Sequence, residues 1–581
     1  MTDQKNMILA IVLSVLILLG FQFFVERPKY EQQRAQQAQE QAQQQAGSES
    51  TVPTPGQQAA PGVPGGAGGA AAGVGRDAAL ALSPRVKVST PSVQGSIALK
   101  GARIDDVVLS NYRVALDPAS PPIHLLDPSG SAQPYYAEFG WVSAGGAAVA
   151  LPSPESVWSA SADTLTPDAP VTLTWDNGQG LTFERTVAVD KDYLFSVKQR
   201  VVNRTGEPVT LYPYGLISRG GTPATVDFYI LHEGPLGVFD DTLTEFKYAD
   251  LREDGDVKKT ATGGWIGITD KYWLAALVPG QGKPWTYNFR YTDSNRTDRY
   301  QVDYLGEAMS VAAGGEAAVE SLLFAGAKEV KLLDRYEEQH GIANFDLAID
   351  FGWFYFLTKP FFYVLTWLHA LLGNFGLAIL GLTVIIKLLF FPLANKSYKS
   401  MAKMKELTPK LQEMREKYGD DRQRLNEEMM ALYKREKVNP AAGCLPILIQ
   451  IPVFFALYKT LFVSIEMRHA PFYGWIRDLS APDPTSLFNL FGLIPWDPPQ
   501  FLMIGAWPVL MGLTMFLQQK LNPQPTDPVQ AKVFMFLPIM FTFLLGHFAA
   551  GLVIYWTWNN LLSIAQQAII MRRMGIRRAL S

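Results

Sequence analysis

The chain has 581 residues, a formal net charge of −3 and an apolar content of 48%. This length predicts more than one domain, and the single cysteine, Cys444, excludes an intramolecular disulfide. The apolar residues gather in long runs towards the C-terminus, which is typical of a membrane protein with a large soluble insert.

The first apolar run covers residues 7–25, within a predicted N-terminal anchor at 1–25. A cleaved signal peptide is the alternative, but its apolar core normally spans only about 7–15 residues before a cleavage site of small residues. This run is longer, and Glu26, Arg27 and Lys29 follow it. The sequence therefore predicts an uncleaved transmembrane signal anchor.

Residues 26–79 are rich in Gln, Ala, Pro and Gly. They cannot bury a core and are predicted to form a flexible linker. From 80 to 335, short alternating segments separated by turn residues predict one all-β sandwich. Its clearest hairpin joins 171–175 to 181–189 through an Asp-Asn-Gly turn. The region holds no Gly-rich phosphate loop, no H-E-x-x-H and no G-x-S-x-G, so we predict no enzyme active site there.

Residues 336–373 are aromatic-rich, and the stretch 358–372 carries Lys359 and His369 among apolar residues. We interpret this stretch as an amphipathic helix at the outer membrane interface, with Trp367 at headgroup level. A further membrane span is the alternative interpretation.

The run 374–394 is long enough to cross a hydrocarbon core of about 30 Å as a helix. It carries one full charge, Lys387, and Thr383 lies one turn earlier on the same face. A lysine inside a span is costly unless it finds water or a partner. Snorkelling to the helix end near Pro392 is the alternative to a functional role. No intramembrane serine or carboxylate is evident as a partner for this lysine.

The charged segment 395–441 places an apolar residue at every third or fourth position. This spacing predicts an antiparallel cytoplasmic helical hairpin of coiled-coil type. A self-contained seam with a solvated charged face is one interpretation. Methionine suits adaptable binding surfaces, which leaves room for a contact role. The methionines that we assign to such contacts are Met401, Met404, Met414, Met429 and Met430.

Four more apolar runs follow, and each is predicted to span the membrane. Their bounds are 442–465, 501–519, 532–546 and 551–571, with connecting loops at 466–500 and 520–531 and a basic tail at 572–581. The run 532–546 is short for a full bilayer, so we expect local thinning. Lys459 lies near the far end of its span and is expected to snorkel outward.

The distribution of basic residues predicts the orientation. The segment 395–441 contains 12 lysines and arginines, whereas the loop 466–500 contains only Arg468 and Arg477. The positive-inside rule places the hairpin and the C-terminal tail in the cytoplasm. Counting back through the spans puts the N-terminus in the cytoplasm and residues 26–373 on the exported side.

Two long segments, 400–421 and 429–459, resemble the YidC/Oxa family of membrane protein insertases in its Gram-negative YidC form. The resemblance extends over about 345–571, and the exported domain is similar by position and strand pattern only. It implies a polytopic α-helical protein of the bacterial inner membrane, with a signal anchor and a five-helix core that carries a cytoplasmic hairpin. The large all-β sandwich would then be periplasmic.

The resemblance also implies a hydrophilic groove that is enclosed by the five spans and open to cytoplasm and lipid. The family's single basic groove residue is usually arginine, and the matching position here is Lys387, a point charge without the fork geometry of arginine. Beside Thr383, the expected groove residues are Gln450, Tyr555, Trp556 and Asn559. The turn at 547–550 departs from the Phe-Pro-Ser-Gly type expected of the family.

The function implied is insertion and assisted folding of inner-membrane proteins, with no covalent chemistry and no cofactor or metal. The implied partners are nascent inner-membrane proteins, the Sec translocon, the lipid bilayer, the ribosome and the signal recognition particle receptor, with no direct recognition of nucleic acid. A small-solute transporter with Lys387 as an anion site is an alternative, although no paired repeat is seen. An intramembrane hydrolase with Lys387 as base is another, and it lacks a partner group.

Overall fold

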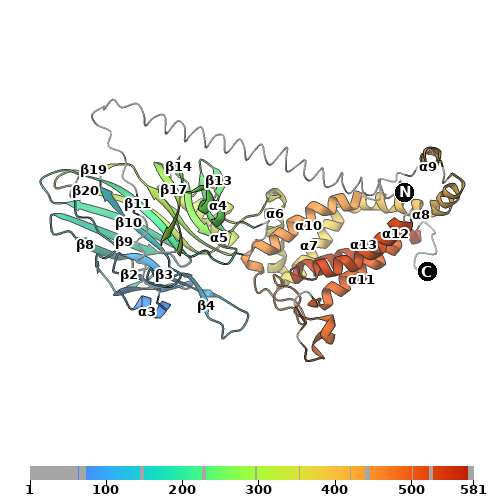
Figure 1. The fold of residues 1–581 in the computed structure, drawn as a ribbon, viewed down its shortest axis with the longest axis horizontal. Helices are drawn as coiled ribbons and strands as arrows, with labels where there is room; N and C mark the ends of the chain where they lie inside the picture. Colours follow the sequence, from blue (N-terminus) through green and yellow to red (C-terminus); the bar gives the residue numbers. More distant parts are fainter. Residues whose placement is uncertain are drawn as a thin grey trace. The chain divides into compact units, whose positions relative to one another are not determined.

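The computed structural model describes residues 63–64, 74–143, 149–225, 231–294, 297–352, 354–418, 421–436, 438, 445–496, 498–499, 502–522 and 528–573. The predicted signal anchor, most of the predicted linker, Cys444 and the tail beyond Arg573 lie outside these residues. Strands occupy the chain from Arg85 to Ala327, and the long helices follow from Tyr355 onward (Figure 1).

The first of two sheets in the described residues has eleven strands. Their bounds are β1 Arg85–Ser89, β2 Val93–Ala98, β3 Arg103–Arg113, β4 Pro122–Leu126, β5 Tyr135–Ser143, β7 Thr164–Leu165, β11 Val209–Gly220, β14 Val257–Thr262, β17 Pro284–Ser294, β18 Thr297–Leu305 and β19 Met309–Val311. The main path is β14-β17-β18-β11-β5-β3-β2-β1-β7, while β19 pairs with β11 and β4 pairs with β3. The neighbours are antiparallel except for β1 and β7, which are parallel.

The second sheet has nine strands in the order β13-β12-β15-β16-β20-β10-β9-β8-β6. Their bounds are β6 Ser159–Ala160, β8 Val171–Asp176, β9 Leu181–Val189, β10 Leu194–Asn203, β12 Gly234–Phe239, β13 Thr242–Glu245, β15 Trp265–Thr269, β16 Trp273–Val278 and β20 Glu316–Ala327. The predicted hairpin is confirmed, because β8 and β9 are antiparallel with Val171 opposite Val187. Gly178 closes its turn at a φ of +68°, which suits glycine.

Strand β9 shows why the two sheets pack together. Its residues alternate between buried and half-buried along its whole length, as expected for a strand with one face in a core. Leu181, Phe183, Val187 and Val189 point into the apolar core. Arg185 occupies the same buried row, so the strand period places a charge inside the core. The prediction of an all-β domain is confirmed.

Short helices cap and follow this domain. They are α3 Arg76–Leu80, α4 Tyr248–Asp254, α5 Val330–His340 and the 3₁₀ turn η2 Phe345–Ala348. Buried side chains of α5 and η2 join the core of the β domain. The chain then enters the helical region.

Eight helices make up the described helical region. Their bounds are α6 Tyr355–Leu372, α7 Phe375–Leu389, α8 Phe391–Tyr418, α9 Arg422–Arg435, α10 Leu445–Val463, α11 Ala506–Leu521, α12 Pro528–Leu545 and α13 Ala550–Arg573. Within the described ranges, no helix alone has the length and hydropathy of a membrane span, whereas α7 and α8 reach them as a pair bent by 70°.

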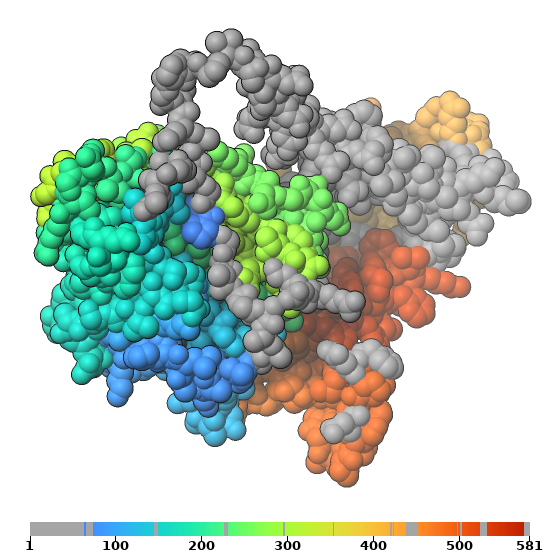
Figure 2. Space-filling view, turned by 60° about the vertical axis from the view of Figure 1, so that its left-hand side comes forward, coloured from blue at the N-terminus to red at the C-terminus, as the bar shows by residue number. Residues whose placement is uncertain are grey.

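The loop between α10 and α11 contains two short 3₁₀ segments, η4 Ile465–Met467 and η5 Leu487–Gly492. Figure 2 shows part of this loop, in orange, as a lobe at the lower edge of the view. The N-terminus of α13 is hydrogen-bonded to the same loop, because Ala550 N–H donates to the carbonyl of Ala481 at 2.7 Å. The loop is therefore part of the folded helical region.

The junction of α7 and α8 corrects the sequence prediction of one helix over 374–394. The first helix ends at Leu389 and the next begins at Phe391. Pro392 then lies in the first turn of α8, where its missing N–H leaves no helical bond unmade. Lys387 therefore lies two residues from the end of α7, closer than a helix end near Pro392 would place it.

The predicted hairpin is formed by α8 and α9. Their seam contains the buried residues Leu407, Leu411, Leu432 and Val438. Apolar side chains at three- and four-residue spacing meet along this seam, as the sequence predicted. The two helices therefore stabilise each other through this seam, to which Val438 beyond α9 adds, while Ala402 of α8 also packs against Leu521 and Met571.

Candidate functional site

A pocket of about 40 Å³ opens beside Lys387, between α7, α8 and α10. This volume accommodates only a few water molecules. The residues that line it are Ile386, Lys387, Phe390, Leu393, Ala394, Tyr398, Gln450 and Val453. Lys387 is the charged member of this lining, so the pocket is a mostly apolar cup with one cation, the amide of Gln450 and the phenol of Tyr398.

The ammonium group of Lys387 has a hydroxyl partner on a helix far away in the sequence. Its Nζ donates to Ser563 Oγ of α13 at 2.7 Å, and Ser563 in turn donates to the carbonyl of Asn559 at 2.8 Å. No carboxylate of the described residues lies within ion-pair distance of Lys387. An ammonium has three donors, so this arrangement leaves donor capacity directed at the pocket.

Ser563 is the residue that sequence reasoning missed, since no serine was evident as a partner for Lys387. One signal was available. Ser563 follows Asn559 by four residues, which places both on one face of the helix. Asn559 was an expected groove residue, and extending its face by one turn would have found the serine.

Two of the expected groove residues contact each other directly. Gln450 of α10 donates from its Nε2 to the hydroxyl of Tyr555 on α13. Gln450 lines the pocket, and Tyr555 is buried behind it. This polar contact links α10, which lines the pocket, to α13, which does not line it.

The other expected groove residues lie outside the pocket lining. Thr383 is buried, and its hydroxyl donates to the carbonyl of Ile379 one turn earlier at 2.7 Å. The ring of Trp556 packs on that of Phe454 at 4.2 Å between centroids. Asn559 is buried and acts through its carbonyl on Ser563.

The five methionines assigned to hairpin contacts differ in exposure. Met404, Met414 and Met429 pack partly buried against the seam of α8 and α9. Met401 is half-buried, and Met430 is exposed. Three of the five therefore serve the seam, and Met430 has the side chain most accessible to a partner.

Lys459 corrects a second expectation. It does not extend outward, because its Nζ lies 2.7 Å from a carboxylate oxygen of Asp350 and the residue is buried. Asp350 precedes α6 and also accepts the main-chain N–H of Gly352 at 3.0 Å. A lysine that finds a fixed carboxylate has no need to reach bulk water.

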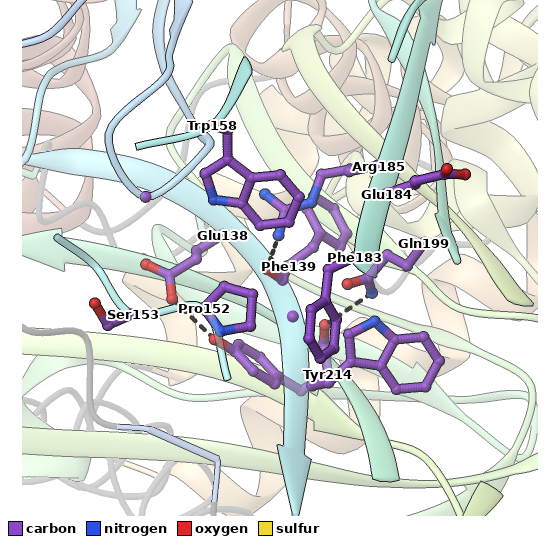
Figure 3. Close-up of a pocket in the computed structure, with 13 residues that line it drawn as sticks. Glu138, Phe139, Pro152, Ser153, Trp158, Phe183, Glu184, Arg185, Gln199 and Tyr214 are labelled. Atoms are coloured by element: carbon purple, nitrogen blue, oxygen red, sulfur yellow. Dashed lines mark hydrogen bonds between the residues drawn. The ribbon is translucent and has the colours of Figure 1, made fainter. Parts of the chain in front are cut away.

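The β domain holds a second pocket with a buried cation, Arg185 (Figure 3). Its guanidinium donates to the carbonyls of Ala102 and Phe139, and Trp158 lies over it at 5.0 Å. Burial lowers the pKa of the Arg185 guanidinium. The cavity is only about 10 Å³, about the size of one water, so it has no room for a ligand.

Within the described ranges, no group of three or more His, Cys, Asp or Glu residues is placed to hold a metal ion. The lysine pocket is therefore the site whose chemistry needs an explanation.

The chain thus combines an all-β domain with a helical region that carries Lys387 beside a small, mostly apolar pocket, the two-part organisation that the known proteins below share. Residues 85–364 match the family model described as YidC periplasmic domain, and residues 367–577 match the model described as 60Kd inner membrane protein. The chain belongs to the YidC family, as its sequence motifs predicted.

Similar proteins cover nearly the whole chain. The membrane protein insertase YidC of Methylobacterium radiotolerans is 53% identical over 99% of this chain and 96% of its own length. That of Bradyrhizobium diazoefficiens is 52% identical over 99% and 97%. A crystal structure of an active YidC insertase with its first transmembrane domain resolved aligns with 83% of this chain and 92% of its own, at 18% identity and a TM-score of 0.34. The relatives are named as insertases, a non-enzymatic role, and do not favour a transporter.

Proposed function

We propose that this protein inserts inner-membrane proteins into the bilayer and helps them fold, through a groove built around Lys387. The observation that carries the proposal is the ammonium group of Lys387, held by one hydroxyl beside an open pocket. A carboxylate that enters the pocket meets a cation with donors to spare, and no existing ion pair must first be broken. The family of the chain supports the same activity.

The proposed placement in the membrane follows the sequence. Helices α7, α10, α11, α12 and α13 span the bilayer, the hairpin and both termini are cytoplasmic, and the β domain is periplasmic. Helix α6 lies along the outer interface, because Phe356, Trp367 and Leu371 expose large apolar side chains on it. The bilayer thins around α12, whose apolar part is short.

Insertion in this scheme needs no nucleotide. The pocket beside Lys387 shortens the hydrocarbon path for the polar tail of a client, and the cation attracts acidic residues in that tail. The apolar helix of the client then moves along exposed apolar side chains of α10 and α12, such as Phe455 and Phe536. Its transfer into lipid supplies about 25 cal/mol per Å² of apolar area, and the membrane potential acts on its charges.

The proposed partners are nascent inner-membrane proteins and the surrounding lipid, with the Sec translocon for part of the clients. The hairpin of α8 and α9 receives clients or targeting partners, among them the ribosome and the signal recognition particle receptor. Its exposed Met430 and its solvated charges suit transient contact.

Photo-crosslinking during insertion tests the proposal. The full chain is reconstituted in lipid vesicles and given a single-span client with an acidic tail. A photoreactive residue replaces Phe455 on α10, Phe536 on α12 or Gln179 in the exposed β8–β9 turn, which serves as the control. We expect protein-dependent insertion and crosslinks from the first two positions only. Equal insertion into protein-free vesicles, or equal crosslinking from position 179, would contradict the proposal.

A further inference from the structure

The segment 487–496, between α10 and α11, exposes apolar side chains without a single charge among them. We call it the apolar loop. Leu493 is 83% exposed, and six further residues are between 38% and 50% exposed. These six are Leu487, Phe488, Leu490, Phe491, Ile494 and Trp496. A contiguous exposed apolar surface of this kind marks an interaction site.

Several backbone groups of the apolar loop have hydrogen-bond partners within the loop or directly beside it. Phe491 N–H donates to the carbonyl of Ser486 at 2.8 Å, and Ile494 N–H donates to that of Asn489 at 3.0 Å. The Asn489 side chain accepts from Gly492 N–H at 3.0 Å and donates to the carbonyl of Trp496 at 3.5 Å. Backbone groups that are paired in this way suit surroundings that offer no hydrogen bonds, such as lipid.

The loop also holds a strained conformation. Leu490 has φ 50° and ψ 46°, and Phe491 has φ 58° and ψ 35°. These are left-handed values that residues other than glycine rarely adopt. Both side chains are exposed, so the strain gains no burial within the chain. Burial of these two side chains in apolar surroundings outside the chain would offset the strain.

The base of the loop is fixed to the helical region. Leu487 N–H donates to the carbonyl of Ile504 at 2.9 Å. The buried carboxylate of Asp483 accepts from Trp475 Nε1 at 3.0 Å and from Trp507 N–H, in the first turn of α11, at 2.9 Å. The loop therefore projects from a hydrogen-bonded base at the N-terminal end of α11, with exposed Trp475 and Tyr473 beside it. Aromatic residues of this kind are enriched at membrane interfaces.

We infer that the apolar loop inserts among the acyl chains of the outer leaflet and anchors that end of α11 in the bilayer. The inference rests on the membrane placement given under the proposed function. Lipid is favoured over a protein partner because specific protein interfaces carry about one hydrogen bond per 100–200 Å², whereas the loop directs its one polar side chain, Asn489, onto itself. The loop between α10 and α11 projects across the long axes of the helices and not past their ends (Figures 1 and 2). It therefore lies beside the helices.

Depth-dependent quenching tests the inference. Leu493→Cys is made in the full chain with Cys444 replaced by serine, labelled with a polarity-sensitive fluorophore and placed at one copy per nanodisc of phosphatidylethanolamine and phosphatidylglycerol. Gln179→Cys, in the β8–β9 turn, is the aqueous reference. Phe536→Cys, on the exposed face of α12, is the membrane reference. Ile494→Cys gives an independent second measurement from the loop.

We expect the labels at 493 and 494 to be quenched several-fold more by shallow nitroxide lipids, and several-fold less by iodide, than the label at 179. Quenching at both positions like that at 179 overturns the inference, while lipid quenching at 536 leaves the proposed placement intact. Aqueous quenching at 536 would overturn that placement and the inference with it. Aqueous quenching at 493 together with protein crosslinks there in cells would assign the loop to a protein partner and also overturn the inference.

Discussion

The β domain and the helical region each place a cation beside a pocket, Arg185 buried and Lys387 half-buried, and the two cations are held differently. Arg185 lines a space of about 10 Å³ and donates to two main-chain carbonyls, that of Ala102 just before β3 and that of Phe139 in β5, while its Nε has no partner in the described residues. Lys387 has one side-chain hydroxyl and a pocket four times as large, about 40 Å³ against about 10 Å³. Both sites lack a direct ion pair to a carboxylate in the described residues.

The difference teaches how to separate a structural cation from a functional one. Backbone acceptors cannot leave, so Arg185 stabilises the strands that present them. A lone hydroxyl leaves most of the donor capacity of an ammonium unused, so Lys387 remains available to an incoming carboxylate. Glu466, an acidic residue where the two regions meet, is also only partly satisfied, since one of its carboxylate oxygens has a partner and the other has none in the described part of the chain.

The largest effect is expected in the β domain. Arg185→Met leaves two buried carbonyls without donors, and each such loss costs about 1–3 kcal/mol, so the domain should lose about 4 kcal/mol of unfolding free energy. Arg185→Lys should lose less. Arg200→Met, which removes surface ion pairs with Glu184 and Glu316, should change stability little. Denaturant unfolding followed by tryptophan fluorescence measures all three, and an unchanged midpoint for Arg185→Met would break the comparison.

Glu466 should make the junction of the two regions sensitive to pH. Its Oε1 accepts the N–H of Val330 at 3.2 Å, and burial raises its pKa from 4.5 to about 7. A raised pKa in the folded state means full stability below about pH 4.5 and loss as the pH rises through 7. The loss is about 3.5 kcal/mol, at about 1.4 kcal/mol per pH unit.

The matched variant for this prediction is Glu466→Gln, which keeps the acceptor and removes the titration. Unfolding free energies of parent and variant should agree at pH 4.5 and diverge towards pH 8, with the variant more stable. Parallel pH profiles would show that Glu466 does not titrate in this range.

Charge changes at Lys387 should have a smaller effect on free energy and a specific one on clients. A charge pair about 4 Å apart is worth about 1 kcal/mol in water and about 4 kcal/mol at an effective dielectric of 20, and a wet pocket lies between them. Lys387→Arg should keep activity, Lys387→Ala should impair insertion of acidic-tail clients several-fold, and Lys387→Glu should impair it more. Neutral-tail clients should respond little.

The measurement is insertion of matched acidic-tail and neutral-tail clients at equal protein levels. If Lys387→Ala and Lys387→Glu insert both clients as the parent does, the residue only snorkels. Lys387 would then be a structural cation like Arg185, and the proposed difference between the two residues would not hold.

The smallest effect is expected at Ser563. Ser563→Ala removes the hydroxyl that holds the Lys387 ammonium, a hydrogen bond worth about 1 kcal/mol. Acidic-tail insertion should fall by less than in Lys387→Ala, and Ser563→Thr should restore it. A double variant with Lys387→Ala should show no further loss, because the two residues act as one unit. Additive losses would indicate a separate role for the serine.

Much of the architecture followed from local patterns. The alternation along 181–189 fixed a strand with one buried face, and the spacing of apolar residues in 395–441 predicted the seam of α8 and α9. Such patterns act within one element and its direct neighbour, so a short window of sequence contains them. The resemblance of long motifs added Gln450 and Tyr555, which the structure brings together.

The sequence by itself determined the order of elements, the family and the presence of one charge in an apolar run. Only the tertiary structure decided what that charge contacts. Lys387 and Ser563 lie 176 positions apart, and their meeting depends on how α7 and α13 are rotated against each other. The ion pair of Lys459 with Asp350 also depends on how distant segments pack. Periodicity gives the face of a helix but not the residues opposite it, because the packing of distant segments sets that choice.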